Sequence, residues 1–264
     1  MKPLLSSAAK PRVGQGRFPE IDLFRGLSVI AMVLFHLFWD LVYFDLVPWE
    51  LLGENPLLVA WTIAGSFQLL AGISLSISYA RAVKQGGRAG IWKKFVVRGL
   101  KLLAWAGVVS AAVYFTVDMP IFFGILHLIG TAIILAPLFL PRPLLAGICG
   151  LAIILATRWL AALPVSGWWL LPLGIGEINL AMADYYPLRP WLGVILLGIW
   201  LGSLLYPGGQ RRFPLLALER VNALPGAAFI RLLGRHSLLI YLIHQPIVFG
   251  AVFGLHTLLG YLAG

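Results

Sequence analysis

The chain consists of long apolar stretches separated by short polar segments. Seven of these stretches have about the 20 residues that a helix needs to cross a lipid bilayer. We therefore predict an all-α, polytopic membrane bundle of about seven transmembrane helices, forming a single domain over 21–264 behind a flexible arm over 1–20. The predicted spans are 21–43, 57–80, 95–117, 121–140, 144–162, 188–206 and 237–262.

Two further apolar pieces are too short or too polar to cross the membrane. The segment 165–176 holds two tryptophans and is typical of an interfacial or re-entrant segment. The segment 213–233 mixes apolar residues with Glu219, Arg220 and Arg231 and is broken by Pro225. We expect it to lie along the inner membrane surface.

Composition excludes an ordinary soluble domain. The chain has 264 residues, of which 60% are hydrophobic and 11% are charged, whereas soluble domains carry about 25% charged residues. Its one cysteine, Cys149, cannot form a disulfide framework or a cysteine metal site within the chain, and we predict no metal. No apolar signal-peptide core precedes Ile21, so we expect the arm to be retained.

The formal charge of +10 reflects topology rather than nucleic-acid binding. When the predicted spans alternate across the membrane, eighteen of the twenty Lys and Arg residues fall on one side, and only Arg158 and Arg189 fall on the other. The positive-inside rule then places the N-terminus in the cytoplasm and the C-terminus outside. We therefore expect a lipid bilayer around the protein and no nucleic-acid partner.

The first span carries three ionisable residues on one helical face. Arg25 and His36 are eleven residues apart, close to three turns, so they point the same way about 16 Å apart. Asp40 follows His36 by one turn. Ionisable groups at this depth usually face a bundle interior or a wet cavity. A lone histidine there fits a polar helix contact, but the three together favour a functional site with His36 as an oriented base.

Other polar residues extend this face into a track across the membrane. His36 lies about 20 Å from the inner end of its span and His127 about 9 Å from the outer end of another, so both are expected in the outer half. His244 lies about 10 Å along the last span, in the inner half, and Pro246 should kink that helix. Such a track indicates either a conduit or an enzyme that works across the membrane.

Short spacings of small residues predict close helix packing instead of chemistry. They are Gly72 with Ser76 in the second span and Gly198 with Gly202 in the sixth.

The chain also resembles a known family. The spacing R-x10-H at Arg25 and His36 resembles the first-helix motif of integral-membrane acyltransferases that O-acetylate cell-surface sugars. The wider pattern is similar to the heparan-alpha-glucosaminide N-acetyltransferase catalytic-domain family and its bacterial relatives. The matching stretches, spread over residues 21–246, are IDLFRGLSVIAMVLFHLFWD, FFGILHLIG, DYYPLRPWLGVILLGIWLG and LGRHSLLIYLIHQP.

The resemblance implies an acyltransferase that takes an acetyl or acyl group from cytosolic acyl-CoA. The acceptor would be a sugar hydroxyl or amine, in a glycan or amino sugar, at the outer side of a bacterial-type inner (plasma) membrane. His36 occupies the catalytic position of the sugar O-acetylating relatives. The lysosomal member has an asparagine there and its proposed histidine farther along, and residues 47–53 of this chain contain no histidine.

The candidate site residues divide into three groups by expected role. An imidazole can take the acceptor's proton or carry the acyl group, which gives the catalytic candidates His36, Asp40 and His127. Cationic partners for acyl-CoA phosphates are expected at the inner mouth, which gives the donor-binding candidates Arg25, Arg98, Lys101, Arg235 and His244. Outer-side polar residues give the acceptor candidates Asp184, Glu177 and Arg189.

Two other functions fit the same residues. A proton- or ion-coupled transporter or channel would also use an intramembrane His/Asp track, but the chain has neither an inverted repeat nor matching broken helices. A structural membrane protein would leave the Arg, His and Asp line unexplained. The sequence indicates no oligomeric state.

Overall fold

The computed structural model describes residues 17–263 except 166, 177–180, 215–219 and 222, and these residues form helices joined by loops. The long helices are α1 (Pro19–Tyr43), α2 (Pro56–Gly86), α3 (Ile91–Val117), α7 (Leu188–Leu205) and α10 (Ser237–Ala263). The shorter elements are η1 (Trp49–Leu52), α4 (Ile125–Phe139), α5 (Pro143–Leu155), α6 (Thr157–Ala161), η2 (Trp168–Leu170), η3 (Pro207–Gly209) and α9 (Ala227–Arg235). The predicted all-α fold is confirmed for the described residues, in which the one β-feature is an isolated bridge between Phe123 and Tyr185.

Five of the seven predicted spans are long enough to cross a membrane by length and composition. They are the helices α1, α2, α3, α7 and α10. The helices α4 and α5 have 15 and 13 residues, or about 22 and 20 Å, less than the hydrocarbon thickness of about 30 Å. The predicted span 121–140 is shortened because residues 120–123 pair with the segment 183–186. The span 144–162 is divided where α5 ends and α6 begins.

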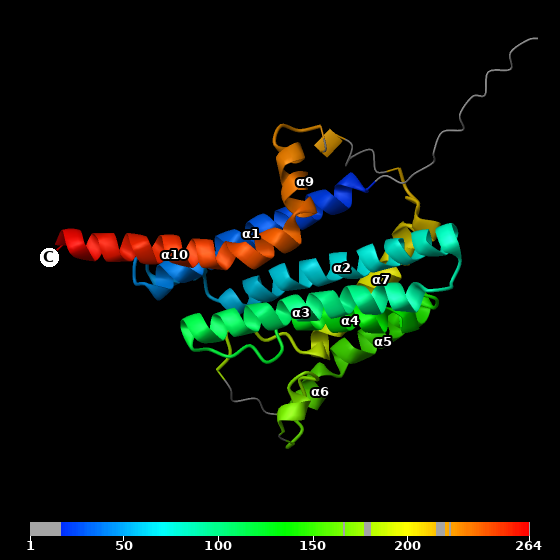
Figure 1. Cartoon of the computed structure of the whole chain (residues 1–264), viewed down its shortest axis with the longest axis horizontal. Helices are drawn as coiled ribbons and strands as arrows, with labels where there is room; N and C mark the ends of the chain where they lie inside the picture. The colour runs from blue at the N-terminus through cyan, green and yellow to red at the C-terminus, as the bar shows by residue number, and fades with distance from the viewer. Residues whose placement is uncertain (1–16, 166, 177–180, 215–219, 222, 264) are drawn as a thin grey trace, which may run out of the picture.

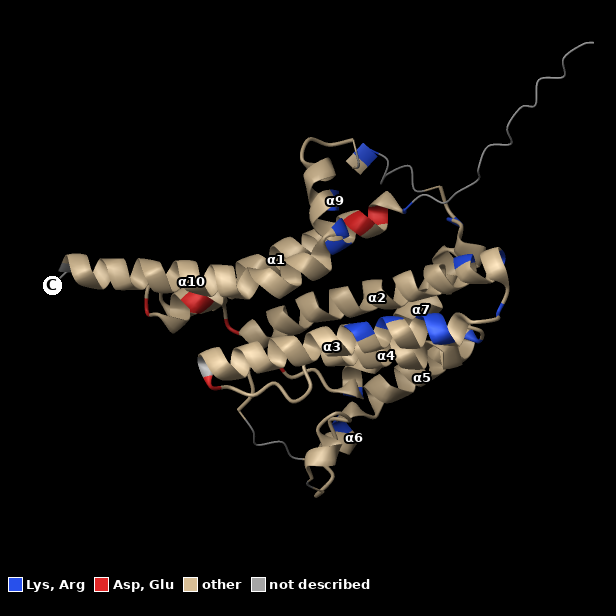
Figure 2. Cartoon of the chain, viewed as in Figure 1, with Lys and Arg blue, Asp and Glu red and all other residues tan. Residues whose placement is uncertain are grey.

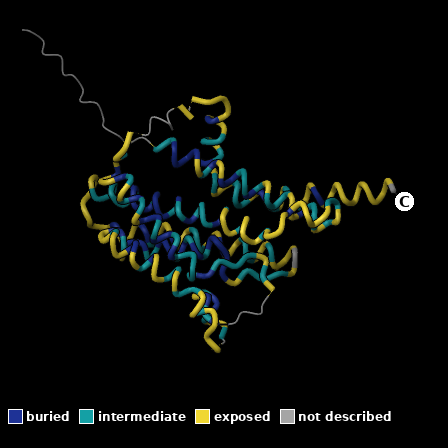
Figure 3. The backbone as a smooth tube through the Cα atoms, turned by 180° about the vertical axis from the view of Figure 1, so that it is seen from behind, coloured by how far each residue is buried: buried dark blue, intermediate teal, exposed yellow. Residues whose placement is uncertain are grey.

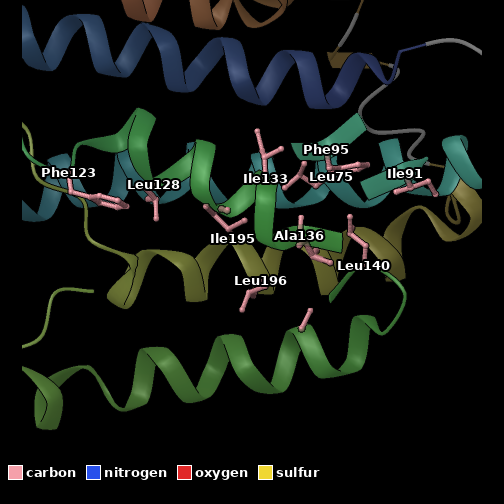
Figure 4. Close-up of a cluster of buried hydrophobic side chains, with 13 residues drawn as sticks. Leu75, Ile91, Phe95, Phe123, Leu128, Ile133, Ala136, Leu140, Ile195 and Leu196 are labelled. Atoms are coloured by element: carbon pink, nitrogen blue, oxygen red, sulfur yellow. The ribbon is translucent and has the colours of Figure 1, made fainter. Parts of the chain in front are cut away.

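The helices form a bundle with a smaller group on one side. In Figure 1, α2, α3, α4, α5 and α7 lie together, and α1, α9 and α10 lie beside them. The bundle core is a cluster of aliphatic and aromatic side chains between these helices. Phe95, Leu128, Ile195 and Leu196 belong to this cluster (Figure 4). Contacts between α1 and α2 join the two groups.

Glycines allow the closest helix contacts, as their spacing predicted. A Cβ atom at Gly72 would overlap the carbonyl oxygen of Ile195, and one at Gly198 would overlap the carbonyl oxygen of Leu69. A Cβ at Gly202 would lie 2.9 Å from the Cβ of Ser76. The packing role of these positions is therefore confirmed: α2 and α7 approach backbone to backbone.

The surface segment predicted over 213–233 contains one described helix, α9. Figure 1 shows α9 crossing the first part of α1 at a steep angle. Gly26 of α1 and Gly234 of α9 permit this contact, since a Cβ at Gly26 would overlap the carbonyl oxygen of Ile230. The opposite face of α9 exposes Phe229 and Leu232. Residues 215–219 and 222 of the predicted segment lie outside the described residues.

Basic residues gather at one end of the molecule. Figure 2 shows most of the Lys and Arg residues where α1 begins, α2 ends and α3 begins. At this end Glu20 is buried and accepts two hydrogen bonds from Arg211, at 2.8 and 2.7 Å. The last two residues of the predicted arm, Pro19 and Glu20, belong to α1, and residues 1–16 lie outside the described residues.

The far half of α10 extends away from the other helices. Figure 3 shows it exposed along most of its length, and Phe253, Leu258 and Tyr261 are among its exposed side chains. An apolar helix with this exposure is suited to contact with lipid.

Candidate functional site

Two histidines from helices far apart in the sequence meet inside the molecule. The rings of His36 on α1 and His244 on α10 lie 4.8 Å apart, centroid to centroid, at an interplanar angle of 78°. Nδ1 of His36 lies 2.8 Å from the carbonyl oxygen of Met32, and Nδ1 of His244 lies 2.8 Å from that of Tyr241. Since a carbonyl oxygen only accepts hydrogen bonds, both Nδ1 atoms donate, and the Nε2 atoms of the neutral rings carry the lone pairs.

The two rings differ in their surroundings. His36 is partly exposed, whereas His244 is buried and its Nε2 has no hydrogen-bond partner among the described residues. His36 is therefore the more accessible of two imidazoles whose Nε2 atoms accept no hydrogen bond from the residues that the structure describes.

Asp40 and Gln245 complete this group of side chains. Asp40 lies one turn after His36 and is 2% exposed. Its carboxylate oxygens accept hydrogen bonds from Nε2 of Gln245, at 3.1 and 3.3 Å. The carboxylate also lies close enough to His36 to interact with it electrostatically. We call these four residues, His36, Asp40, His244 and Gln245, the histidine-pair cluster.

A second polar cluster lies between α3, α4 and α10. Ser110, His127, Asp184 and Tyr241, which we call the Asp184 cluster, line a small cavity of about 10 Å³, roughly the space that one water molecule needs. Nδ1 of His127 accepts the backbone N–H of Gly124 at 3.2 Å, so the ring proton of neutral His127 is on Nε2. Oδ2 of Asp184 accepts the backbone N–H of Ile125 at 3.0 Å.

Burial controls the protonation of Asp184 and of the two tyrosines that follow it in the chain. It raises the pKa of Asp184 to about 6, although the N–H of Ile125 and the hydroxyl of Tyr241 favour the charged form. It also raises the pKa of Tyr185 to about 12 and that of Tyr186 further. Asp184 therefore changes its charge just below neutral pH, while both tyrosines stay neutral.

Tyr241 connects the two clusters. Its ring lies 5.9 Å from the ring of His244, centroid to centroid, and its hydroxyl faces Asp184 and interacts with it. His127 thus belongs to the Asp184 cluster, which Tyr241 links to the histidine pair. Sequence reasoning missed Tyr241, although its position three residues before His244 places both on one face of α10.

The contact between His36 and His244 differs from the depths expected for them. Counting along each span placed His36 in the outer half of the membrane and His244 in the inner half. The structure places the rings side by side. The end of α9 packs on α1 at Asp22 and Gly26, which lie close to Gly234, so α10 begins beyond the first turn of α1 and not level with its start.

The four basic residues among the predicted donor-binding candidates lie at the basic end, whereas the fifth candidate, His244, lies in the histidine-pair cluster. Nη2 of Arg25 donates to Oγ of Ser74 at 2.8 Å, and its Nη1 donates to Asp22 at 3.4 Å. Arg98 of α3 is close enough for its charge to act on Arg25. Arg235 joins the same group because its Nε donates to Asp22 at 3.3 Å. Lys101 is exposed on α3.

The predicted acceptor-binding residues are separated by their contacts. Asp184 lies in the Asp184 cluster, and Arg189 donates to the carbonyl oxygen of Thr157 at the start of α6. Glu177 lies outside the described residues.

A wider cavity opens at the end of α1 beyond His36. It measures about 580 Å³ and was not expected from the sequence. The rings of Trp39 and Trp49 stand 5.8 Å apart on its wall. Since Trp39 follows His36 by three residues, the cavity begins about one turn beyond the histidine pair. It is lined by Trp39, Val42, Tyr43, Asp45, Leu46, Val47, Pro48 and Trp49.

These features define a helical membrane protein with a paired imidazole site between its first and last helices. The chain belongs to the family described as "Heparan-alpha-glucosaminide N-acetyltransferase, catalytic", whose model matches residues 17–246. The matched range includes α1 and the part of α10 that carries His244, and the membership implies a membrane acetyltransferase. No curated protein and no solved structure matches the chain. In the described part of the chain, no three His, Cys, Asp or Glu residues are grouped to hold a metal ion.

Proposed function

We propose that the protein transfers an acetyl or other acyl group from cytosolic acyl-CoA to a sugar hydroxyl or amine at the outer side of a bacterial-type inner membrane. The observation that carries this proposal is the pair His36 and His244, whose rings meet 4.8 Å apart between two apolar helices and whose Nε2 atoms carry free lone pairs. A base with this placement suits proton transfer from an acceptor.

His36 is the proposed general base. Its Nε2 takes the proton as the acceptor oxygen or nitrogen attacks the thioester carbonyl. When the carbon–sulfur bond breaks, His36 returns that proton to the CoA thiolate, so that the products are the acylated acceptor and free thiol. The bond from Nδ1 to Met32 fixes the ring, and the negative charge of Asp40 favours the imidazolium that forms between the two steps.

Arg25 and Arg98 are the proposed partners of the CoA phosphates, together with Lys101 and Arg235. Guanidinium groups bind phosphate oxygens through paired, charge-assisted hydrogen bonds. Arg25 shares a helical face with His36, about 16 Å away along α1. This spacing leaves room for the extended pantetheine arm of the donor, which would run along α1 from the phosphates to the histidine pair.

The acceptor would enter through the cavity beyond His36. Trp39, Tyr43 and Trp49 offer aromatic faces, and Asp45 adds a carboxylate. Aromatic faces and a carboxylate suit an acceptor that carries an amine, which attacks the thioester in its neutral form. On this proposal the domain over 21–264 is single, α4 and α5 complete seven crossings with bilayer thinning, and the N-terminus is cytoplasmic.

Acyl-CoA binding and thiol release test the function together. Acetyl-CoA should raise the melting temperature of the purified protein by mass action, and amino-sugar oligosaccharides should then stimulate thiol release. His36→Ala should lower turnover by at least about 100-fold and leave the acetyl-CoA shift intact. The matched control is His256→Ala, an exposed histidine of α10. No shift with any acyl-CoA, together with proton flux in liposomes, would instead support a transporter.

A further inference from the structure

Tyr241 is the α10 residue that lines the small cavity of the Asp184 cluster. That cavity is otherwise lined from α3, α4 and the segments beside them. Along its own helix, Tyr241 contacts His244 twice, through its ring at 5.9 Å and through its carbonyl oxygen, which accepts from Nδ1. The position of Tyr241 therefore bears directly on the orientation of His244.

Asp184 is held in place from several sides. Its Oδ2 accepts the first N–H of α4, from Ile125. Its own segment pairs with residues 120–123, through bonds from Ala183 N to Pro120 O at 3.2 Å and from Tyr186 N to Phe123 O at 2.8 Å. The carboxyl also fits against Gly124, where a Cβ atom would overlap it. The position of the Asp184 carboxyl is thus fixed by its contacts with the start of α4 and by the pairing of its own segment.

We propose that Asp184 and Tyr241 are positioning residues for the histidine pair: the carboxyl of Asp184 anchors the hydroxyl of Tyr241, and the anchored tyrosine holds His244 against His36. This inference rests on the proposed acyl transfer. It assigns to Asp184 a role inside the protein instead of a contact with the acceptor. Neither residue touches the reacting atoms.

The surroundings of His244 give this anchor a use. Among the described residues its Nε2 has no hydrogen-bond partner, so the ring is oriented by its Nδ1 bond and by its contacts with Tyr241 and His36. His127 cannot replace Asp184 as the acceptor for Tyr241, because its Nδ1 already accepts from Gly124 and its Nε2 carries the proton.

The anchor should depend on pH. The titratable groups that face Asp184 are Tyr241 from α10, His127 from α4 and Tyr186 from its own segment. Burial raises the pKa of Asp184 to about 6. Above that pH the carboxylate accepts the tyrosine hydroxyl, and below it the proton removes part of that acceptor capacity. The anchor therefore weakens as the pH falls through about 6.

Two conservative substitutions test the proposal. Tyr241→Phe removes only the hydroxyl, and Asp184→Asn removes only the titrating charge. Each should lower kcat about tenfold with an unchanged KM for acetyl-CoA, because Phe has no hydroxyl to bond and the amide oxygen of Asn accepts that hydroxyl more weakly than a carboxylate does. The double variant should lose no more than Tyr241→Phe alone, because the anchor is already absent without the hydroxyl. Tyr261→Phe, an exposed tyrosine on the same helix, is the control and should match the wild type.

A pH profile separates positioning from general stability. Protonation of the base His36 lowers kcat at acid pH in every variant. Below about pH 6 kcat should fall more steeply in the wild type and in Asp184→Glu than in Asp184→Asn, which has no carboxyl group at this position to protonate. If Asp184→Asn fails to fold, as judged by its melting curve, Tyr241→Phe and Asp184→Glu still decide the question. Unchanged kcat and an unchanged profile in Tyr241→Phe would overturn the inference, as would losses that multiply in the double variant.

A readout without turnover keeps this inference distinct from the proposed function. In protein labelled with ¹⁵N-histidine, Tyr241→Phe should move the imidazole resonances of His244 and leave those of the exposed His236 unchanged. If the wild type transfers no acyl group but the His244 resonances move, the proposed function fails and the anchor stands. Resonances of His244 that do not move would overturn the anchor, whatever the activity.

Discussion

The imidazole rings of His36 and His244 meet edge to face, 4.8 Å apart, although 208 residues separate them in the chain. Each ring is fixed through Nδ1 by a carbonyl of its own helix. The site therefore depends on how α1 and α10 pack, and a substitution that separates these helices should lower activity without touching either histidine.

Arg25 should control donor affinity. Arg25→Gln removes the cation but keeps a side chain that can bond Ser74, so we expect the Kd for acetyl-CoA to rise about tenfold or more. The measurement is the acetyl-CoA concentration that gives half of the maximal melting-temperature shift. Lys93→Gln, an exposed basic residue near the start of α3, is the control. Equal affinities in both variants would remove Arg25 from the donor site.

Gly72 should be required for the contact between α2 and α7. In Gly72→Ala the new methyl group overlaps the carbonyl oxygen of Ile195, so overpacking should cost about 1–3 kcal/mol. In Gly250→Ala, on α10, the methyl group meets no atom within 4 Å, so this control should leave the melting temperature close to that of the wild type. Equal melting temperatures for the two variants would contradict the close packing.

Asp184 should give stability a pH dependence. Its pKa is raised to about 6 in the folded protein, against about 3.9 in an unfolded chain. Between about pH 4 and 6 the folded state keeps a proton that the unfolded state has lost, so the stabilisation from this group is lost as the pH rises through that window. The melting temperature of the wild type minus that of Asp184→Asn should fall from pH 4 to pH 6.5. A difference that rises instead would show that the pKa of Asp184 is lowered by folding.

The membrane orientation can be tested with single cysteines, because Cys149 is the only native one. In a Cys149→Ala background, Tyr261→Cys should react with a membrane-impermeant thiol reagent in intact spheroplasts. Lys2→Cys should react only after permeabilisation. The reverse pattern would invert the proposed topology and place the acyl-CoA site on the wrong side.

The sequence predicted the local features of this site well. Helical spacing placed Arg25, His36 and Asp40 on one face of the first span, and the structure uses that face for contacts with α2 and α10. The glycine spacing at Gly72 and Gly198 predicted a close helix contact, because residues without a side chain let two helix backbones approach each other closely.

Relationships between helices were harder to predict. The contact between His36 and His244 was not predicted, because nothing local to α10 reveals where α9 places the start of α10 along α1. The helices α4 and α5 were expected to be longer because hydropathy cannot detect a backbone that leaves the helix to pair with another segment, as residues 120–123 do. Tyr241 was missed because its role comes from Asp184, which is distant in sequence.

Transfer across a bilayer tests the central claim most directly. The protein is reconstituted in sealed liposomes with an amino-sugar oligosaccharide inside and radiolabelled acetyl-CoA outside, and labelled oligosaccharide is then measured in the lumen. We predict labelled product with the wild type and with His256→Ala, and at least about a 100-fold lower rate with His36→Ala. Labelled product at the wild-type rate in His36→Ala would contradict the account.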